Sequence, residues 1–302
     1  MIRGRSFALL GAPLLAAVAL LGLTTLSEGR ASEENKEEAV LIGAGDIADC
    51  ADISGAEATA KLLEANPGTV MALGDLAYPN GTAEDFRCYD KTWGRVRLRT
   101  RPAVGNHEFH SYRAAYYFEY FGPAAGDSKT GYYSYELGAW HVVVLNSECQ
   151  EVGGCGVGSP EEKWLRADLA AHPAGCTLAY FHKPRFSSGL NHGDDLQMIA
   201  FWQALYDFNA ELVLNGHDHD YERFAPQDPN GKADAKRGIR EFVVGTGGKN
   251  HRAFGFAKRN SEVRNNDTFG VLKLTLTPTG YEWKFLPEAG KTFTDEGSGT
   301  CH

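Results

Sequence analysis

Concentrated positive charge is scarce in this sequence. Its 302 residues include 30 Lys and Arg against 39 Asp and Glu, which gives a net charge of -9. Because a protein that binds a nucleic-acid backbone needs clustered Lys and Arg, the composition argues against that class of partner. A site that handles phosphate in this chain would therefore need metal ions to supply its positive charge.

Internal repeats and low-complexity tracts are also missing, and with 43% hydrophobic residues the chain is neither disordered nor fibrous. Two catalytic patterns are incomplete. Gly245-Thr-Gly-Gly248 resembles a phosphate loop, but no Lys-Ser/Thr pair and no expected helix follow it, so we interpret it as a tight turn near the predicted site. The pair Ser187-Ser188 lacks a Gly-x-Ser-x-Gly context, which argues against serine hydrolysis.

Residues 1–31 have the pattern of a secretory signal peptide. Two arginines precede an apolar run over residues 7–26, and small residues follow at 29–31. We predict cleavage near Ala31, a polar linker over residues 32–38, and a secreted protein, extracellular or periplasmic, with no transmembrane segment after cleavage. The alternative is an uncleaved membrane anchor, because the apolar run is almost long enough to span a bilayer.

Six cysteines follow this segment. An even number behind an export signal predicts disulfides rather than thiolate metal ligands. Cys149 and Cys155 flank a glycine-rich loop and are expected to pair. The pairs Cys50 with Cys88 and Cys176 with Cys301 would complete the set, but other pairings of these four remain open.

Short apolar runs alternate with helical segments as far as residue 214, and a β-rich segment follows. Strands are expected at 39–45, 69–73, 101–104, 131–135, 141–145, 177–181, 210–214, 239–244, 269–277 and 281–286. Helices are expected at 54–66, 82–93, 112–121, 161–171 and 194–209. This order predicts an α/β fold in which two packed sheets carry helices on their outer faces. We assign residues 39–302 to a single catalytic domain.

Polar side chains with metal-ligand chemistry follow several of these strands. They are Asp46, Asp75 with Tyr78, Asn106 with His107, His182, and His217 with His219. The carboxyl ends of strands are where open α/β sheets bind ligands. Carboxylate, amide, phenol and imidazole groups together suit iron, zinc or manganese. They outnumber the ligands of one tetrahedral ion, so they favour two ions that share a carboxylate.

These residues stand in five motifs, namely Gly45-Asp46, Gly74-Asp75-Leu-Ala-Tyr78, Gly105-Asn106-His107-Glu108, His182 before Lys183-Pro184, and Gly216-His217-Asp-His219. In this order, over most of the chain, the motifs resemble those of the calcineurin-like metallophosphoesterases, and within them the purple acid phosphatases. That family's fold is a four-layer α/β/β/α sandwich of two packed mixed sheets.

The resemblance implies a role for each position. Asp46, Tyr78 and His219 would hold a first ion, Fe(III); Asn106, His182 and His217 would hold a second, divalent ion (Zn, Fe or Mn); and Asp75 would bridge them. The common pattern has a histidine where this chain has Ala48, and Tyr78 would replace that ligand. A ferric tyrosinate gives the purple subgroup its colour. That subgroup usually has glycine at this position, so Ala48 leaves the ferric assignment less direct than the dinuclear one.

Two further histidines are expected to contact substrate. His107 follows a predicted ligand, and His192 lies ten residues after His182, as does the family's substrate-contacting histidine. When protonated, both would bind phosphate oxygens and pass a proton to the leaving alcohol. The other histidines are interpreted as structural or surface residues; they are His110, His141, His172, His251 and His302.

The inferred reaction is hydrolysis of a small phosphomonoester by metal-activated hydroxide that attacks phosphorus. A trivalent ion acidifies bound water strongly, so activity at acidic pH is expected. The alternatives are a phosphodiesterase or nucleotidase on the same metal core, and a non-catalytic phosphate-binding surface protein. Loss of a ligand would indicate the last of these, and none of the seven predicted ligands is missing. The sequence leaves the oligomeric state open.

Overall fold

The first sheet contains six strands, and its central strands are buried apolar runs. This computed structural model describes residues 38–302. The strands of the first sheet lie in the spatial order β15 (Glu296–Thr300), β14 (Gly280–Pro287), β13 (Gly270–Thr277), β1 (Ala39–Ala44), β3 (Thr69–Leu73) and β5 (Thr100–Ala103). The strands β1, β3 and β5 run parallel, whereas β13 pairs with β1 in the antiparallel sense. The predicted signal peptide (1–31) and nearly all of the predicted linker (32–38) lie outside the described residues.

The second sheet contains seven strands. Their order is β12 (Ser261–Asn265), β10 (Tyr221–Phe224), β11 (Arg240–Val244), β9 (Leu212–Asn215), β8 (Cys176–Tyr180), β7 (Trp140–Val144) and β6 (Tyr133–Leu137). The strands β7, β8, β9 and β11 are parallel, and antiparallel strands flank them on both sides. Both sheets are therefore mixed, as predicted.

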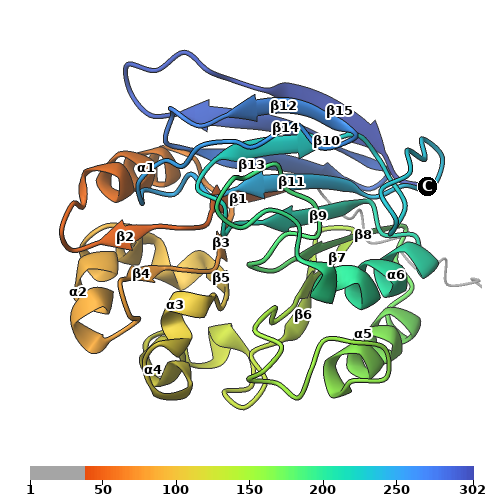
Figure 1. The fold of residues 1–302 in the computed structure, drawn as a ribbon, viewed down its shortest axis with the longest axis horizontal. Coiled ribbons are helices and arrows are strands. Elements are labelled where there is room, and N and C mark those ends of the chain that lie inside the picture. The colour runs from red at the N-terminus through yellow and green to blue at the C-terminus, as the bar shows by residue number, and fades with distance from the viewer. Residues whose placement is uncertain (1–37) are drawn as a thin grey trace, which may run out of the picture. The chain divides into compact units, whose positions relative to one another are not determined.

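Alternating side chains of the second sheet enter two different apolar layers. Leu178 and Leu214 join a cluster with Leu272 and Leu274 of the first sheet. Their neighbours Ala179 and Val213 instead join side chains of α5 (Pro160–Ala171) and α6 (Ile199–Asp207). Because neighbouring side chains of a strand point to opposite faces, the sheets pack on each other and these helices cover the outer face of the second sheet (Figure 1). The predicted fold class is confirmed.

Helix α1 (Ser54–Ala65) packs against β13 of the first sheet (Figure 1). Helix α2 (Ala83–Lys91) follows the capping residue Thr82. The shorter elements are α3 (Asn106–Phe109), α4 (Ala115–Phe121) and a parallel pair of β2 (Ala48–Asp49) and β4 (Ala77–Tyr78). Short 3-10 helices cover Trp93–Arg99, Tyr112–Ala114, Gly122–Ala125 and Leu196–Met198.

The sequence-based element list needs corrections of two kinds. The helices expected over residues 112–121 and 194–209 are each a 3-10 turn followed by a shorter helix, α4 and α6. Five strands were not expected, namely β2, β4, β10, β12 and β15. The last of these reads Glu-Gly-Ser-Gly-Thr and is mostly exposed, so it has no apolar pattern that would predict a strand.

All six cysteines form disulfides: Cys50 with Cys88, Cys149 with Cys155, and Cys176 with Cys301. The expected pairing of Cys149 with Cys155 is confirmed, and the structure selects the suggested pairing of the other four. The bond to Cys301 joins the end of the chain to the first residue of β8. Across residues 38–302, each helix is too short or too polar to cross a lipid bilayer.

Removal of the long-range disulfide is expected to cost more stability than removal of the short-range one. The Cys176–Cys301 bond closes a loop with a sequence separation of 125, whereas that of Cys149–Cys155 is 6. Loop-closure entropy then predicts losses of about 5 and about 2 kcal/mol when both partners become alanine. Urea unfolding of the two double variants measures these losses. Equal losses would contradict this account.

Candidate metal centre

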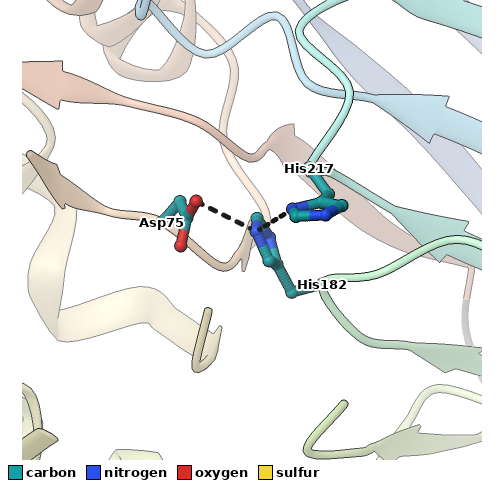
Figure 2. Close-up of side chains that lie close together, drawn as sticks. All are labelled: Asp75, His182 and His217. Atoms are coloured by element: carbon teal, nitrogen blue, oxygen red, sulfur yellow. Dashed lines mark hydrogen bonds and ion pairs between the residues drawn. The ribbon is translucent and has the colours of Figure 1, made fainter. Parts of the chain in front are cut away.

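Six of the seven predicted ligands follow the carboxyl ends of strands in the two large sheets, and the seventh lies in the short β2–β4 pair. From the first sheet, Asp46 follows β1, Asp75 follows β3 and Asn106 follows β5; Tyr78 lies on β4; from the second sheet, His182 follows β8 and both His217 and His219 follow β9. Figure 2 shows His182 between Asp75 and His217, with the three side chains pointing toward one another. The amide of His217 donates a hydrogen bond to Asp46 Oδ2, although the two residues are 171 positions apart in the sequence.

A first group of side chains surrounds the Tyr78 hydroxyl. Its oxygen lies 2.8 Å from Asp46 Oδ1, 3.2 Å from Asp75 Oδ2 and 3.2 Å from His219 Nε2. His219 Nε2 is also 3.3 Å from Asp46 Oδ1. These four side chains are at most 2% exposed. Buried oxygen and nitrogen atoms at this spacing can contact a single cation.

A second group surrounds His182. Its Nε2 lies 3.1 Å from Asp75 Oδ2 and 3.1 Å from His217 Nδ1. Asn106 Oδ1 is buried and has no hydrogen-bond partner among residues 38–302. Such an orphaned acceptor is costly unless another group binds it. The second group thus has a place for a cation, and it shares Asp75 Oδ2 with the first group.

Backbone carbonyls fix the orientation of two imidazoles. Nδ1 of His182 lies 2.8 Å from the Leu73 carbonyl, and Nδ1 of His219 lies 2.8 Å from the Asn250 carbonyl. A carbonyl accepts only, so each Nδ1 donates and each Nε2 faces the carboxylates. This arrangement is typical of metal-binding histidines, whose other nitrogen is held by an outer hydrogen bond. The donor set therefore fits metal ions.

The centre favours positive charge. Burial by itself lowers the pKa of His182, but the adjacent Asp75 carboxylate outweighs burial and raises it to about 10. Burial raises the pKa of Asp46, yet the neighbouring His219 and His182 bring it below its ordinary value. The pKa of Asp75 is lowered in the same way, chiefly because His182 outweighs burial. A cation can take the place of the proton that this environment attracts.

Three of the predicted ligands have left-handed backbone conformations. The φ angles are 59° at Asp46, 51° at Asp75 and 73° at His217. Residues other than glycine avoid this region, at a cost of about 1–3 kcal/mol each, and such strain concentrates at functional sites. The surrounding contacts must therefore hold these loops in place.

Close packing explains why glycine precedes two of these ligands. A Cβ atom on Gly74 would lie 2.5 Å from His182 Nδ1, and one on Gly105 would lie 2.3 Å from the backbone nitrogen of Asp75. Both distances are shorter than any normal contact. Gly74-Asp75 and Gly105-Asn106 thus need glycine because no side chain fits beneath the centre.

Glu108 anchors the loops, a role that the sequence did not reveal. Its buried carboxylate accepts hydrogen bonds from the amides of Asp75 (3.0 Å), Leu76 (2.8 Å), Ala77 (3.2 Å) and Gly105 (2.9 Å). It thereby joins the loop that carries Asp75 to the loop that precedes Asn106. Its only sequence signal is its place in the Gly-Asn-His-Glu motif.

Substitution Glu108→Gln is expected to lower the free energy of unfolding by about 2 kcal/mol or more, because the amide NH2 would face amide donors that it cannot accept from. Metal content should fall as well, since both loops lose their anchor. Urea unfolding and elemental analysis measure the two effects. Glu119→Gln at an exposed position of α4 is the matched control. Equal unfolding free energies and equal metal contents of the two variants would refute the anchoring role.

The two predicted substrate-contacting histidines contact different predicted ligands. His107 donates its amide to Asp75 Oδ1 at 2.8 Å, and its Nδ1 lies 2.6 Å from the Pro79 carbonyl. His192 stacks on His217, with ring centroids 3.9 Å apart. Both adjoin predicted metal ligands.

An arginine that the sequence did not single out contacts His192. The Arg252 guanidinium donates a hydrogen bond to His192 Nε2. Burial lowers the pKa of His192, and Arg252 lowers it further while Asp218 opposes the shift. A guanidinium only donates, so His192 Nε2 accepts in this contact, and Arg252 places a positive charge next to it. Its only signal in the sequence is its position shortly after the glycine-rich turn.

A cavity of about 380 Å³ opens beside the second group, and its lining includes Asn106, Lys183, His192 and His217. The glycine-rich turn packs behind the first group, since the amide of Gly247 donates to the Gly45 carbonyl at 2.8 Å. It is a turn near the site, as predicted. The centre thus has a cavity beside its second group, and the glycine-rich turn is bonded to the loop that carries Asp46.

This arrangement has the donor groups that suit a metal centre. A sequence model of the calcineurin-like phosphoesterases matches residues 24–221, and the chain is a member of that family. Family membership and the relatives' names imply a dimetal centre. The family that the five motifs predicted is confirmed.

Within the family, the chain is similar to purple acid phosphatases. Purple acid phosphatase 15 of Arabidopsis thaliana is 27% identical over 203 residues, which are 54% of this chain and 37% of that protein. The phosphoenolpyruvate phosphatase of Allium cepa is 30% identical over 182 residues, or 51% and 36% of the two chains. The match thus spans well under half of these relatives' length.

Solved structures support the fold. The purple acid phosphatase PPD1 of yellow lupin (Lupinus luteus) superposes with a TM-score of 0.76 at 16% identity, over 87% of this chain and 53% of that chain. GAP50, described as the anchor in the inner membrane complex of Plasmodium, gives a TM-score of 0.66 at 14% identity, over 86% and 88%. At these identities the similarity shows the fold alone.

Proposed function

We propose that this protein is an exported, dinuclear metal-dependent phosphatase that hydrolyses phosphomonoesters, similar to the purple acid phosphatases. The observation that supports it most directly is the shared position of Asp75 Oδ2, which lies 3.2 Å from Tyr78 Oη and 3.1 Å from His182 Nε2. A bridging carboxylate is what two adjacent ions require. The three disulfides support export, since such bonds persist in oxidising compartments.

In this proposal each group of side chains holds one ion. Asp46, Tyr78 and His219 would bind Fe(III); Asn106, His182 and His217 would bind Zn, Fe or Mn in the divalent state; Asp75 would bind both. When bound, such ions polarise phosphoryl oxygens and lower the pKa of water, so that hydroxide is available to attack phosphorus.

The ferric assignment requires a phenolate at Tyr78. Its phenol is buried, and burial together with Asp46 and Asp75 raises its pKa well above the ordinary value. Loss of its proton therefore requires a strongly charged cation in direct contact with the oxygen. Fe(III) is such a cation, and it suits phenolate oxygen.

The remaining polar groups would handle the substrate. The Arg252 guanidinium, which contacts the cavity-lining His192, would bind phosphate oxygens, and His192 would hold that guanidinium in place through the hydrogen bond described above. His107, held by Asp75 and the Pro79 carbonyl, would contact substrate on the other side. Lys183 is less available because its Nζ lies 2.7 Å from Glu148 Oε2.

Elemental analysis and a visible spectrum of the purified protein test this function. We expect two metal ions at the candidate centre, a tyrosinate-to-iron absorption band, and hydrolysis of p-nitrophenyl phosphate that is fastest at acidic pH. Tyr78→Phe should abolish the band but retain metal. Asp75→Asn should lower the metal content, and it should lower kcat/KM by at least about 100-fold.

A fully active protein without metal would exclude the proposal. Faster hydrolysis of bis(p-nitrophenyl) phosphate than of the monoester would replace the phosphatase with a phosphodiesterase on the same metal core. Metal without hydrolysis of either ester would indicate the non-catalytic alternative.

Arg252→Ala is expected to raise KM for p-nitrophenyl phosphate and to lower kcat/KM about 10- to 100-fold, because a charge-assisted hydrogen bond contributes about 1.5–3 kcal/mol. Steady-state kinetics measure the effect, and metal content should stay constant. Arg259→Ala removes an exposed arginine of the same segment and serves as the control. Unchanged kinetics in Arg252→Ala would exclude phosphate binding by this side chain.

A further inference from the structure

A second cluster of metal-binding side chains lies at the other end of the second sheet. His141 is near the start of β7, and Asp168 and His172 are in and just after the last turn of α5. One ligand atom from each residue lies within 4.8 Å of the other two. The predicted ligands of the phosphatase centre are instead at the carboxyl ends of the strands, so the two clusters are separate.

Asp168 is the middle of this cluster. Its Oδ2 lies 2.8 Å from His141 Nε2, and its Oδ1 lies 3.3 Å from His172 Nδ1. The same His172 Nδ1 lies 2.9 Å from the Asp168 carbonyl, a contact that metal binding through this nitrogen has to replace. The imidazole rings of His141 and His172 are nearly parallel, with centroids 4.9 Å apart. These spacings are similar to the 2.8–3.3 Å between the side-chain atoms of the phosphatase centre. Two imidazole nitrogens and one carboxylate are a donor set that Zn²⁺ commonly binds.

Outer contacts orient the two buried members of the cluster. His141 Nδ1 lies 2.7 Å from Glu136 Oε1, which leaves Nε2 directed toward Asp168. The Ser134 hydroxyl donates to Asp168 Oδ1 at 2.8 Å. A carboxylate behind the histidine and a donor on the ligating carboxylate are the outer interactions that metal sites use.

His172 connects the cluster to solvent. Its side chain is 49% exposed, whereas those of His141 and Asp168 are 1% and 8% exposed. A metal ion can therefore reach the cluster from solvent, and water can complete a tetrahedral set of ligands. Without metal, the contacts of His141 with two carboxylates require a proton on both ring nitrogens; a metal ion would replace the proton on Nε2.

We propose that His141, Asp168 and His172 bind one divalent transition-metal ion, with Zn²⁺ as the best match, at a site separate from the phosphatase centre. The ion joins β7 to the end of α5 and stabilises the helix against the second sheet. Three protein ligands and a solvent-facing position are few for a permanent structural site, so the ion exchanges with the surrounding medium.

Counting zinc in His172→Ala tests this site. The wild type and the variant are dialysed to equilibrium against the same Zn²⁺-containing buffer, and zinc and iron per chain are measured above the buffer background. We expect the variant to lose one equivalent of zinc while its iron content stays unchanged. His302→Ala, which removes an imidazole at the end of the chain, should retain the full count. Equal zinc in all three proteins would overturn the proposal.

A second variant separates metal binding from a purely ionic contact. Glu136→Gln keeps all three ligands but weakens the outer support of His141, so Zn²⁺ affinity at this site should fall about 10- to 100-fold. Saturating Zn²⁺ should raise the Tm of the wild type by about 5 °C or more and that of His172→Ala by less. Identical Zn²⁺ shifts in these proteins would show that the cluster is a protonated ion pair only. Since Asp75→Asn removes metal from the other centre, failure of either proposal is visible separately.

Discussion

The structure depends on the burial of two neighbouring carboxylates. Asp46 and Asp75 are 0% and 2% exposed and contact the same phenol oxygen, so water does not solvate the charge of either carboxylate. Buried charges are tolerated only when they are paired. The imidazoles that pair with them, His182 and His219, follow strands of the other sheet. The two sheets must therefore present their carboxyl ends at one common edge, and the packed-sheet architecture meets that requirement.

Short loops can carry this charge because the backbone itself is held rigidly. The left-handed conformations of Asp46 and Asp75 direct their carboxylates inward, and glycine at position 74 lets His182 approach. Glu108 gathers the amides of two loops around one carboxylate. The motifs are thus a steric and hydrogen-bonding requirement of the centre as much as a set of ligands.

Much of the centre was predictable because parallel strands align their carboxyl ends, so residues such as Asp46 and Asp75 meet once the strands are recognised. Strand β15 was not predictable, because its glycines are required by close packing against the neighbouring strand. A Cβ atom on Gly297 would lie 2.4 Å from the Trp283 ring. Local patterns carry no sign of such a neighbour. The cluster around Asp168 was missed because His141 comes from a distant strand, although the Asp168 and His172 pair at i and i+4 is visible in the sequence.

The origin of the ligands in two sheets has a mechanical consequence. Asp75 and Asn106 follow strands of one layer and His182 and His217 follow strands of the other, so an ion bound by all four is a cross-link between the layers. Any slippage of one layer against the other would change bond lengths at the ion directly. The alignment of the whole sandwich and the integrity of its reactive edge are therefore a single property, and damage far from the ions can reach them through the sheets.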